Sequence, residues 1–331
     1  MSKIVYITGC LGFIGSYVTR KCLDAGFYVR GVDCISYAAN KEYLAEFNKS
    51  DNFVFENKNI NDIEFLYDCD YFINIAAETH VGNSIVCSKD FVNSNVNGVH
   101  NILELLRRHR GEHSHKPTLI HFSTDEVYGD ISEGVHSEKD LLKPSNPYSA
   151  TKAAADMLIL AWSRTYNLNY VILRPTNNYG LGQYVEKLLP KAIKYLSLGR
   201  KIPLHNNGDP VRNWLHADDT ASAVMKIIEK NVVNEIYNIC GGFEQKNIEA
   251  VKQVIECFFK KGTEDNDDEM LGELSSIRHD DYIDYSYSRA GQDVRYALDD
   301  SKLRSLGWKP NKIFKHEISD IVDNHKNKFT W

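Results

Sequence analysis

The sequence has no segment suited to crossing a membrane. Nowhere do roughly 18 apolar residues follow one another, which is the length that a membrane helix requires. A charged-then-apolar signal pattern is also missing, because Met1, Ser2 and Lys3 lead directly into the strand-like residues 4–8. These absences predict a cytoplasmic protein that does not engage a membrane.

Cysteine is scarce and scattered. The seven cysteines form an odd set, and no two of them are spaced as Cys-x-x-Cys. Such a set argues against a disulfide framework and against a zinc site of the usual spacing. We therefore expect a reducing compartment and no metal.

Positive charge is not in excess. The chain has 39 Lys and Arg residues against 45 Asp and Glu residues, a formal net charge of -6, and no long basic run. Proteins that bind nucleic-acid phosphates usually carry a basic patch or stripe. The composition therefore predicts a small-molecule ligand and no nucleic-acid partner.

Short β-rich segments alternate with longer helical periods. This alternation predicts an α/β fold with a Rossmann-type, doubly wound parallel sheet. The expected strands are residues 4–8, 28–33, 53–56, 71–75, 118–123, 170–173 and 235–239, and the main expected helices are 14–25, 91–110 and 147–166.

The alternation weakens after Arg174, where four prolines fall within 36 residues, from Pro175 to Pro210. We expect a first domain of residues 1–174 and 215–246. A smaller, discontinuous C-terminal substrate domain would then comprise residues 175–214 and 247–331.

A glycine-rich turn follows the first expected strand and opens a helix. Gly9, Gly12 and Gly15 are spaced as G-x-x-G-x-x-G. Glycines let the backbone approach a pyrophosphate, and the helix start offers free N–H groups and partial positive charge. Asp33 ends the second expected strand, where its carboxylate can accept hydrogen bonds from both ribose hydroxyls and would repel a 2′-phosphate. The pattern favours NAD over NADP, with a plain turn and a helix-capping Asp as the alternative.

Tyr148 and Lys152 are four residues apart in the helix expected at 147–166, so they share one face. A nearby ammonium favours phenolate, and we expect it to lower the pKa of Tyr148 so that Tyr148 can take a hydroxyl proton. Combined with the dinucleotide turn, the pair resembles the catalytic pair of the short-chain dehydrogenase/reductase family. Over nearly the whole chain the resemblance is to the extended branch of that family, which modifies nucleotide sugars.

Two adjacent carboxylates, Asp125 and Glu126, follow Thr124 at the carboxyl end of an expected strand, where open α/β sheets bind ligands. Sugar 4-epimerases of this family typically have small neutral residues there, because they only remove and return a hydride. Two carboxylates indicate an added acid and base. A nucleotide-sugar 4-epimerase and a non-catalytic NAD-binding protein are the alternatives.

The segment Ser123-Thr124-Asp125-Glu126-Val127-Tyr128-Gly129 closely resembles the motif of the dTDP-glucose 4,6-dehydratases and their UDP-glucose-using relatives. Residues 33–40, 76–81, 177–180 and 289–293 resemble further blocks of the same family, in the same order. The resemblance implies a lyase that makes an NDP-4-keto-6-deoxyglucose, a deoxysugar intermediate of the kind used for rhamnose.

The resemblance also implies the roles of the catalytic set. NAD+ takes a hydride from glucose C4 while Tyr148, assisted by Thr124, removes the C4 hydroxyl proton. Glu126 then abstracts the C5 proton, Asp125 protonates the departing C6 hydroxyl, and the hydride returns to C6. The two carboxylates need different pKa values for this division of labour, and adjacent like charges in a closed pocket tend to raise at least one of them.

Further site residues follow from the resemblance, position by position. NAD, tightly bound and recycled in each turnover, would contact Gly9, Gly12, Phe13, Ile14, Gly15, Asp33, Ser36, Asn59, Ile60, Ala76, Ala77, Thr79, Ser94, Tyr148 and Lys152. The nucleotide sugar would contact Thr79, Thr124, Asn178, Lys187, Leu188, Pro203, His205, Arg212, Asn247 and Arg289.

Several positions depart from the family pattern. Gly9-Cys10-Leu11 replaces Gly-Gly-Ala, Asn59 replaces Asp, and Gly82-Asn83 replaces Asp-Arg. His205 stands where the family often has Tyr, and Gln292 where it often has His. We interpret these two polar replacements as weakening contacts to the methyl group of thymine, and so as favouring uracil without excluding thymine.

The resemblance implies a homodimer as well. The helices expected at residues 91–110 and 147–166 would form a four-helix bundle with the same helices of a second subunit.

Overall fold

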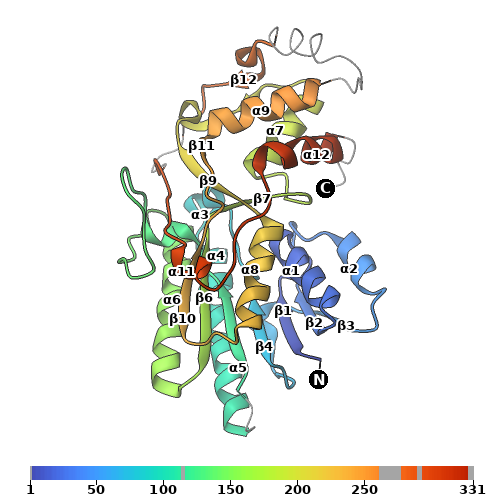
Figure 1. Ribbon diagram of the computed structural model, residues 1–331, viewed down its shortest axis with the longest axis vertical. Helices are drawn as coiled ribbons and strands as arrows, with labels where there is room; N and C mark the ends of the chain where they lie inside the picture. Colours follow the sequence, from blue (N-terminus) through green and yellow to red (C-terminus); the bar gives the residue numbers. More distant parts are fainter. Residues whose placement is uncertain (1, 113–115, 261–276, 289–292, 327–331) are drawn as a thin grey trace.

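The computed structural model describes residues 2–112, 116–260, 277–288 and 293–326 (Figure 1). Seven parallel strands form its main sheet in the order β10-β6-β5-β4-β1-β2-β3. Their bounds are β1 Ile4–Thr8, β2 Tyr28–Asp33, β3 Phe53–Asn57, β4 Tyr71–Asn74, β5 Thr118–Phe122, β6 Asn169–Pro175 and β10 Glu235–Ile239. All seven expected strands are present, with ends within two residues of the prediction, and the Rossmann-type fold is confirmed.

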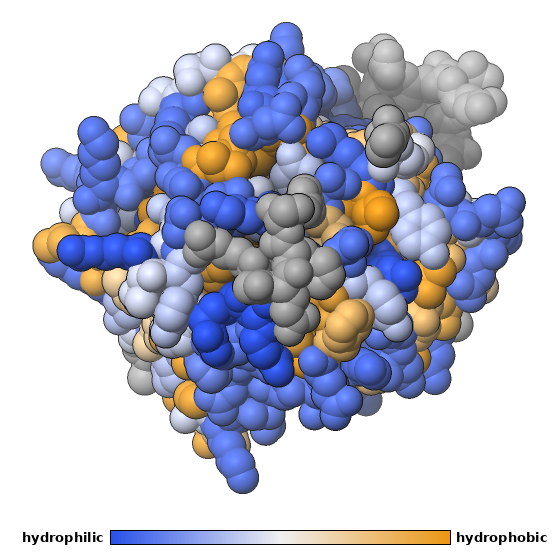
Figure 2. Space-filling model, turned by 90° about the horizontal axis from the view of Figure 1, so that it is seen from below, coloured by the Kyte–Doolittle hydropathy of each residue, from blue (hydrophilic) through white to orange (hydrophobic). Residues whose placement is uncertain are grey.

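Helices cover both faces of this sheet (Figure 1). One face packs against α1 (Phe13–Asp24) and α8 (Ala217–Glu229), and the other against α5 (Gly98–Glu112) and α6 (Pro147–Tyr166). Each face buries its own apolar cluster, so both sides of every central strand are hydrophobic, as parallel sheets require. Seen from below, hydrophilic residues cover most of this end, with hydrophobic residues in small groups between them (Figure 2).

A second lobe lies beyond the carboxyl ends of the strands (Figure 1). It has its own apolar cluster, which includes Ile193, Trp214, Val254 and Phe314. Its helices are α7 Leu188–Ser197, α9 Asn247–Phe259 and α12 Phe314–Lys326. Its strands are β7 Asn177–Tyr179, β9 Val211–His216 and β11 Glu244–Lys246 in one sheet, and β8 Ile202–Pro203 with β12 Ile283–Asp284 in another.

Short elements connect these parts. They are α2 Lys41–Phe47, η1 Ile60–Asp62, α3 Val81–Val86, α4 Lys89–Phe91, η2 Val92–Asn97, η3 Asp125–Tyr128, η4 His205–Gly208, η5 His279–Tyr282 and α11 Ser301–Arg304. Among the described residues, no helix is both long and apolar enough to span a bilayer.

The single helix expected at residues 91–110 is wrong in its first part. Residues Val92–Asn97 form a π-helical segment, η2, and α5 begins only at Gly98. Within η2 the buried Asn95 exchanges two hydrogen bonds, of 2.9 and 3.0 Å, with the backbone of Glu78. It donates a third to Thr151 Oγ1 on α6 at 3.0 Å. Apolar periodicity carries no sign of such a polar anchor.

Polar side chains replace apolar ones where the central strands end. Thr8 of β1, Asn74 of β4 and His121 of β5 are register partners across three adjacent strands. Thr8 Oγ1 accepts from the backbone N–H of Ile75 and Ala76 and donates to Asn74 Oδ1 at 2.6 Å. The side-chain amide nitrogen of Asn74 therefore faces His121 Nδ1, at 3.0 Å. Because an amide nitrogen can only donate, His121 Nδ1 accepts this hydrogen bond, and the proton of the neutral imidazole is on Nε2. This line ties the first turn to the strand that carries the carboxylates.

Candidate active site

The first turn has room only for glycine at two positions. A Cβ on Gly15 would lie 1.9 Å from the carbonyl oxygen of Gly9, and one on Gly9 would lie 2.8 Å from the backbone nitrogen of Ala76. Gly9 also has a φ of +70°, which L side chains rarely adopt. The backbone is therefore bare where α1 starts, and its N–H groups can face a pyrophosphate.

Asp33 ends β2 beside this turn and is buried. Its Oδ2 accepts from Leu11 N at 3.1 Å and its Oδ1 accepts from Ile35 N at 2.8 Å. Each oxygen keeps a second lone pair for a hydroxyl group. Burial raises the pKa of Asp33, and these two hydrogen bonds oppose the shift. The bare turn and this carboxylate fit the pyrophosphate and the ribose of a dinucleotide.

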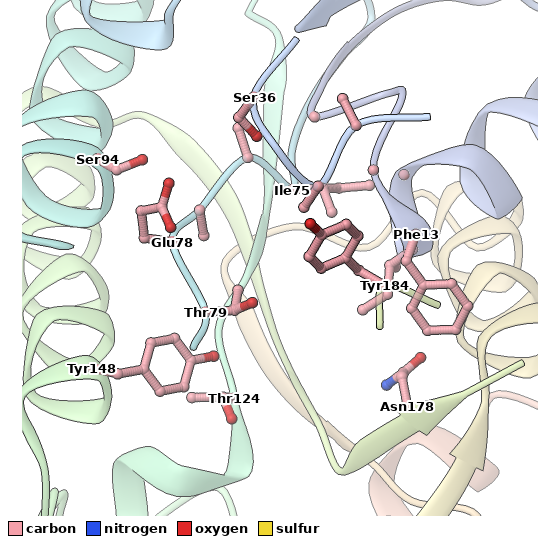
Figure 3. Close-up of a pocket in the computed structure, with 18 of the residues that line it drawn as sticks. Phe13, Ser36, Ile75, Glu78, Thr79, Ser94, Thr124, Tyr148, Asn178 and Tyr184 are labelled. Carbon is pink, nitrogen blue, oxygen red and sulfur yellow. The ribbon is translucent and has the colours of Figure 1, made fainter. Parts of the chain in front are cut away.

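A pocket of about 560 Å³ extends from this turn toward the ends of β4 and β5 (Figure 3). It collects most of the residues expected to hold a cofactor and four of the five residues expected to be catalytic. The expected residues that line it are Gly9, Gly12, Phe13, Ile14, Gly15, Asp33, Ser36, Asn59, Ile60, Ala76, Ala77, Thr79, Ser94, Thr124, Asp125, Glu126, Tyr148, Asn178 and Lys187.

Thr124 and Tyr148 face the same part of this pocket (Figure 3). Thr124 caps η3, since its hydroxyl accepts from Glu126 N at 3.3 Å, and it donates to Asp125 Oδ1 at 3.0 Å. The turn of η3 thus holds both carboxylates at the end of β5, as the sequence predicts for this edge of the sheet.

The two carboxylates have different surroundings. Burial, followed by the neighbouring charge of Glu126, raises the pKa of Asp125 to about 7. Burial also raises the pKa of Glu126, but the Arg212 cation and a hydrogen bond from Asn146 Nδ2, 3.2 Å long, oppose the shift. Asp125 is therefore still partly protonated near neutral pH, whereas Glu126 has two neighbours, Arg212 and Asn146, that favour its anion against the effect of burial.

The expected lowering of the Tyr148 pKa is wrong for the protein by itself. Burial, with the charge of Glu126, raises the pKa of Tyr148, and only the hydrogen bond with Thr124 opposes the shift. Lys152 lies one turn further along α6 and does not line the pocket. Its Nζ donates to the carbonyl of Phe122 at 2.6 Å, and burial lowers its pKa to about 8. In this buried site the desolvation of Tyr148 and the charge of Glu126 decide the direction of the shift.

Asn146 is a site residue that our sequence analysis missed. It is the N-cap of α6, where its side chain accepts from Ser149 N at 3.0 Å in a capping box, and Pro147 follows it. The same side chain donates to Glu126, so the cap that starts the helix of Tyr148 also orients a carboxylate. The Asn-Pro pair was the available signal, because Asn is a preferred N-cap and Pro a preferred first helical residue.

A strap of residues 181–187 crosses from the second lobe to the first, and its contacts were also missed. Tyr17 Oη donates to Leu181 O at 3.1 Å, and Tyr37 Oη donates to Glu186 Oε2 at 3.2 Å. The Lys187 ammonium donates to Thr79 O at 3.0 Å and to Thr79 Oγ1 at 3.2 Å. Tyr184 on this strap lines the pocket opposite Glu78 and Ser94 (Figure 3).

The remaining residues expected to bind substrate lie in the second lobe and are not part of this lining. They are Leu188, Pro203, His205, Arg212 and Asn247. Arg212 donates to the carbonyl of Asp293 at 3.1 Å, and its charge reaches both carboxylates of η3. Arg289 and Gln292 lie outside the described residues.

Comparison with known proteins gives a consistent result. Residues 6–321 match the family model described as GDP-mannose 4,6 dehydratase. The chain is 35% identical to the dTDP-glucose 4,6-dehydratase of Haemophilus influenzae over 96% of both chains. It is similar to the crystal structure of DesIV, a dTDP-glucose 4,6-dehydratase from Streptomyces venezuelae with NAD and TYD bound. That match has a TM-score of 0.83 and 32% identity and covers 97% of this chain and 96% of the other.

The UDP-glucuronic acid 4-epimerase of Bacillus cereus shares the fold but less of the sequence. Its structure gives a TM-score of 0.84 at 22% identity and covers 97% of this chain and 99% of the other. At that identity the likeness concerns the fold alone.

Proposed function

The chain belongs to the family described as GDP-mannose 4,6 dehydratase, and from that premise we propose that it is an NAD-dependent nucleotide-sugar 4,6-dehydratase. Its substrate is dTDP-glucose or UDP-glucose, and its products are the NDP-4-keto-6-deoxyglucose and water. The observation that carries this proposal is the pair Asp125 and Glu126, held beside Tyr148 in one pocket with unequal surroundings.

The residues of the first turn are suited to hold the cofactor. When bound, NAD+ accepts the hydride from C4 of the sugar and later returns it to C6. Gly9, Gly12 and Gly15 leave space for the pyrophosphate, and Asp33 accepts from the ribose hydroxyls. The other cofactor contacts are assigned to Phe13, Ile14, Ser36, Asn59, Ile60, Ala76, Ala77, Thr79 and Ser94, with Tyr148 at the reacting end. Lys152 is assigned to the same end from the resemblance, although it is outside the pocket lining of the protein by itself.

Tyr148 and Thr124 act on the C4 hydroxyl. Tyr148 removes its proton, and a hydrogen bond with Thr124 opposes the burial that raises the pKa of Tyr148. Since burial disfavours the phenolate, the positive charge of Lys152 one turn away is required to make this proton transfer possible.

Asp125 and Glu126 carry out the elimination. Oxidation at C4 acidifies the C5 hydrogen, which Glu126 abstracts as base. Asp125 delivers a proton to the C6 hydroxyl, which leaves as water. Glu126 returns its proton to C5 when the hydride returns to C6, and the proton that Tyr148 took from the C4 hydroxyl makes up for the one that Asp125 gave. The raised pKa of Asp125 supports the acid role, and the Arg212 and Asn146 contacts of Glu126 support the base role.

The alternatives leave these groups without a task. A 4-epimerase keeps the C6 hydroxyl and needs neither carboxylate, and a non-catalytic NAD-binding protein needs none of the buried titratable groups. The relatives named 4,6-dehydratases are also more similar in sequence than the epimerases.

We assign the binding of NAD and the binding of the nucleotide sugar to two different parts of the chain. Residues 1–174 and 215–246 form the NAD-binding domain, and residues 175–214 and 247–331 bind the nucleotide sugar. The separate apolar clusters of the main sheet and of the second lobe support the main parts of this division, while Leu303 and Trp308 of the C-terminal piece pack in the cluster of the main sheet. Asn178, Lys187, Leu188, Pro203, His205, Arg212, Asn247 and Arg289 are assigned to the nucleotide sugar, along with Thr79 and Thr124.

The direct test is a product assay. Purified protein should convert dTDP-glucose or UDP-glucose to its 4-keto-6-deoxy form with no added NAD, because the hydride removed from C4 returns to C6. Mass spectrometry of the product and absorbance at the wavelength of NADH are the measurements. Steady release of NADH in proportion to product, or an epimer with its C6 hydroxyl intact, contradicts the proposal.

Separate changes of the two carboxylates should block different steps. Glu126→Gln should still oxidise C4 but lose the C5 base, so reduced cofactor accumulates on the enzyme. Asp125→Asn should slow water loss, and each change should lower kcat roughly 10²–10⁴-fold. In the wild type, kcat should fall as pH rises through about 7, because Asp125 loses its proton there, and this limb should vanish in Asp125→Asn. Wild-type turnover in both variants would show that the roles are wrongly assigned.

The choice of base stays a prediction from His205 and Gln292. The ring of His205 lies 5.9 Å from that of Tyr287, edge to face, in the second lobe. A methyl contact is worth only about 1–3 kcal/mol, or roughly 10–200-fold. We expect kcat/KM for UDP-glucose to equal or exceed that for dTDP-glucose, measured side by side. A tenfold preference for dTDP-glucose overturns this expectation and leaves the dehydratase assignment in place.

We further propose a homodimer through α5 and α6. The outer face of α6 exposes Ala150, Ala154, Met157 and Ala161, which follow one another at spacings of four, three and four residues. An apolar row on one side of a helix is suited to packing against a second copy. The exposed Leu141 lies beside this row, in a groove that Met157 also lines.

Charge in this row should separate the subunits. Ala154→Glu and Met157→Glu should shift a dimer to monomer in sedimentation velocity at micromolar concentration. Leu198→Glu is the matched control, because Leu198 is 56% exposed on the second lobe and should leave the dimer intact. A wild-type protein that sediments as a stable monomer is incompatible with this interface.

A further inference from the structure

A buried ion pair joins α6 and β6, and neither of its residues lines the active-site pocket. Asp156 is 0% exposed and Arg174 is 1% exposed. Arg174 Nε and Nη2 both donate to Asp156 Oδ2, at 3.0 and 2.9 Å. Arg174 Nη1 donates to Tyr128 Oη at 2.7 Å, and Tyr128 Oη donates to Asn238 Oδ1 at 2.8 Å. The guanidinium group is thus fixed from two sides, and it fixes Asp156 in turn.

Asp156 continues the row of Tyr148 and Lys152 on α6. The three residues are spaced by four, so they lie one above another on one helix face. Arg174 occupies only Oδ2 of Asp156, which leaves Oδ1 for the groups around it. Burial raises the pKa of Asp156, whereas Arg174, Ser123 and Lys152 all favour its anion.

The Lys152 ammonium group is buried, which disfavours its charged form. Lys152 is 3% exposed, and it donates a hydrogen bond to a neutral carbonyl, that of Phe122. Burial lowers its pKa to about 8, and the charge of Asp156 is what opposes this shift. A buried ammonium without a counterion would give up its proton near neutral pH.

We propose that Asp156 is a positioning residue of this site: held by Arg174, it is the counterion that keeps Lys152 protonated next to Tyr148. The consequence for the reaction rests on the proposed function, because it concerns the first proton transfer, from the C4 hydroxyl to Tyr148. The charge state of Lys152 itself does not depend on any substrate.

Other titratable groups face this region from neighbouring elements. His121 on β5 is neutral throughout, because burial and the charge of Lys152 hold its pKa well below its ordinary value. Asp125 and Glu126 of η3 raise the pKa of Tyr148 rather than acting on Lys152. Arg174 on β6 is paired with Asp156 and Tyr128.

The first test measures the protonation of Lys152 directly. Protein labelled with ¹³C at the lysine ε carbon is titrated by NMR, and the Lys152 signal is identified by its absence in Lys152→Arg. Asp156→Asn should lower the titration midpoint of Lys152 by at least about one pH unit, a tenfold change in its proton affinity. Asp156→Glu should restore most of the wild-type midpoint. An unchanged midpoint in Asp156→Asn overturns the proposal.

Two controls separate this effect from damage to the fold. Asp219 is a buried carboxylate of α8 that accepts from Asn311 N and Lys312 N, so Asp219→Asn should destabilise the protein without moving the Lys152 midpoint. If Asp156→Asn does not fold, Asp156→Asn combined with Arg174→Met removes the unpaired cation, and the midpoint of Lys152 should then be lower than in Arg174→Met alone. Equal midpoints in Arg174→Met and in the double variant also overturn the proposal.

The second test reads the first chemical step. Single-turnover reduction of bound NAD is followed in the Asp125→Asn background, so that the titration of Asp125 does not contribute. Adding Asp156→Asn should leave the rate at pH 6 within about twofold and lower it roughly tenfold at pH 9, because Lys152 then loses its proton earlier. An equal loss at all pH values contradicts the proposal. Absence of any reduction in the Asp125→Asn parent contradicts the proposed function instead, and the NMR result still stands.

Discussion

Parallel pairing of β1, β4, β5 and β6 aligns the carboxyl ends of these strands at one edge, and the whole pocket depends on that alignment. The register sets Thr8 beside Asn74 and Asn74 beside His121, so a polar line crosses three strands immediately below the ligand space. On this edge the glycine turn after β1 and the two carboxylates after β5 come within one pocket, although more than 100 residues separate them. Without that register, the motifs would be ordinary turns at separate places.

Much of this arrangement was predictable because it depends on short-range patterns in the sequence. The strands, the turn at Gly9, the acidic end of β2 and the Tyr148–Lys152 spacing each depend on neighbours within a few residues. The interior of the site was less accessible to such reasoning. The π-helical segment Val92–Asn97 contains Asn95, whose hydrogen bonds go to residues distant in the sequence. The strap contacts likewise join tyrosines near the start of the chain to residues 181–187. The pKa of Tyr148 was misjudged because the sequence gives the position of Lys152 but not the degree of burial.

The site concentrates ionisable groups where water is excluded, which opposes folding. Five ionisable side chains of this region are buried, namely Asp125, Tyr148, Lys152, Asp156 and Arg174. Burial of each charge costs on the order of several kcal/mol of hydration free energy before the interactions with its partners are counted. Replacing such a set with apolar side chains would often stabilise a domain. The set is instead held by backbone caps and by fixed side chains, which make the acid and the base different although they are adjacent in sequence. Stability is given up here for the separation of two chemical roles.

The strap of residues 181–187 has a consequence for how long the protein retains its coenzyme between turnovers. It is fastened to the first lobe through three side chains, and a Cβ on Gly182 would lie 1.8 Å from the hydroxyl of Tyr43, so the chain passes close over that ring. Tyr184, Glu186 and Lys187 of the strap line the pocket, so these contacts border the space assigned to the dinucleotide, and we expect them to slow its exchange with the surrounding solution. For a dehydrogenase that must swap its coenzyme every cycle, such a fastening would limit the rate. For a reaction that regenerates the coenzyme in place, it costs nothing, and retention of one molecule over many cycles becomes an advantage wherever free coenzyme is scarce.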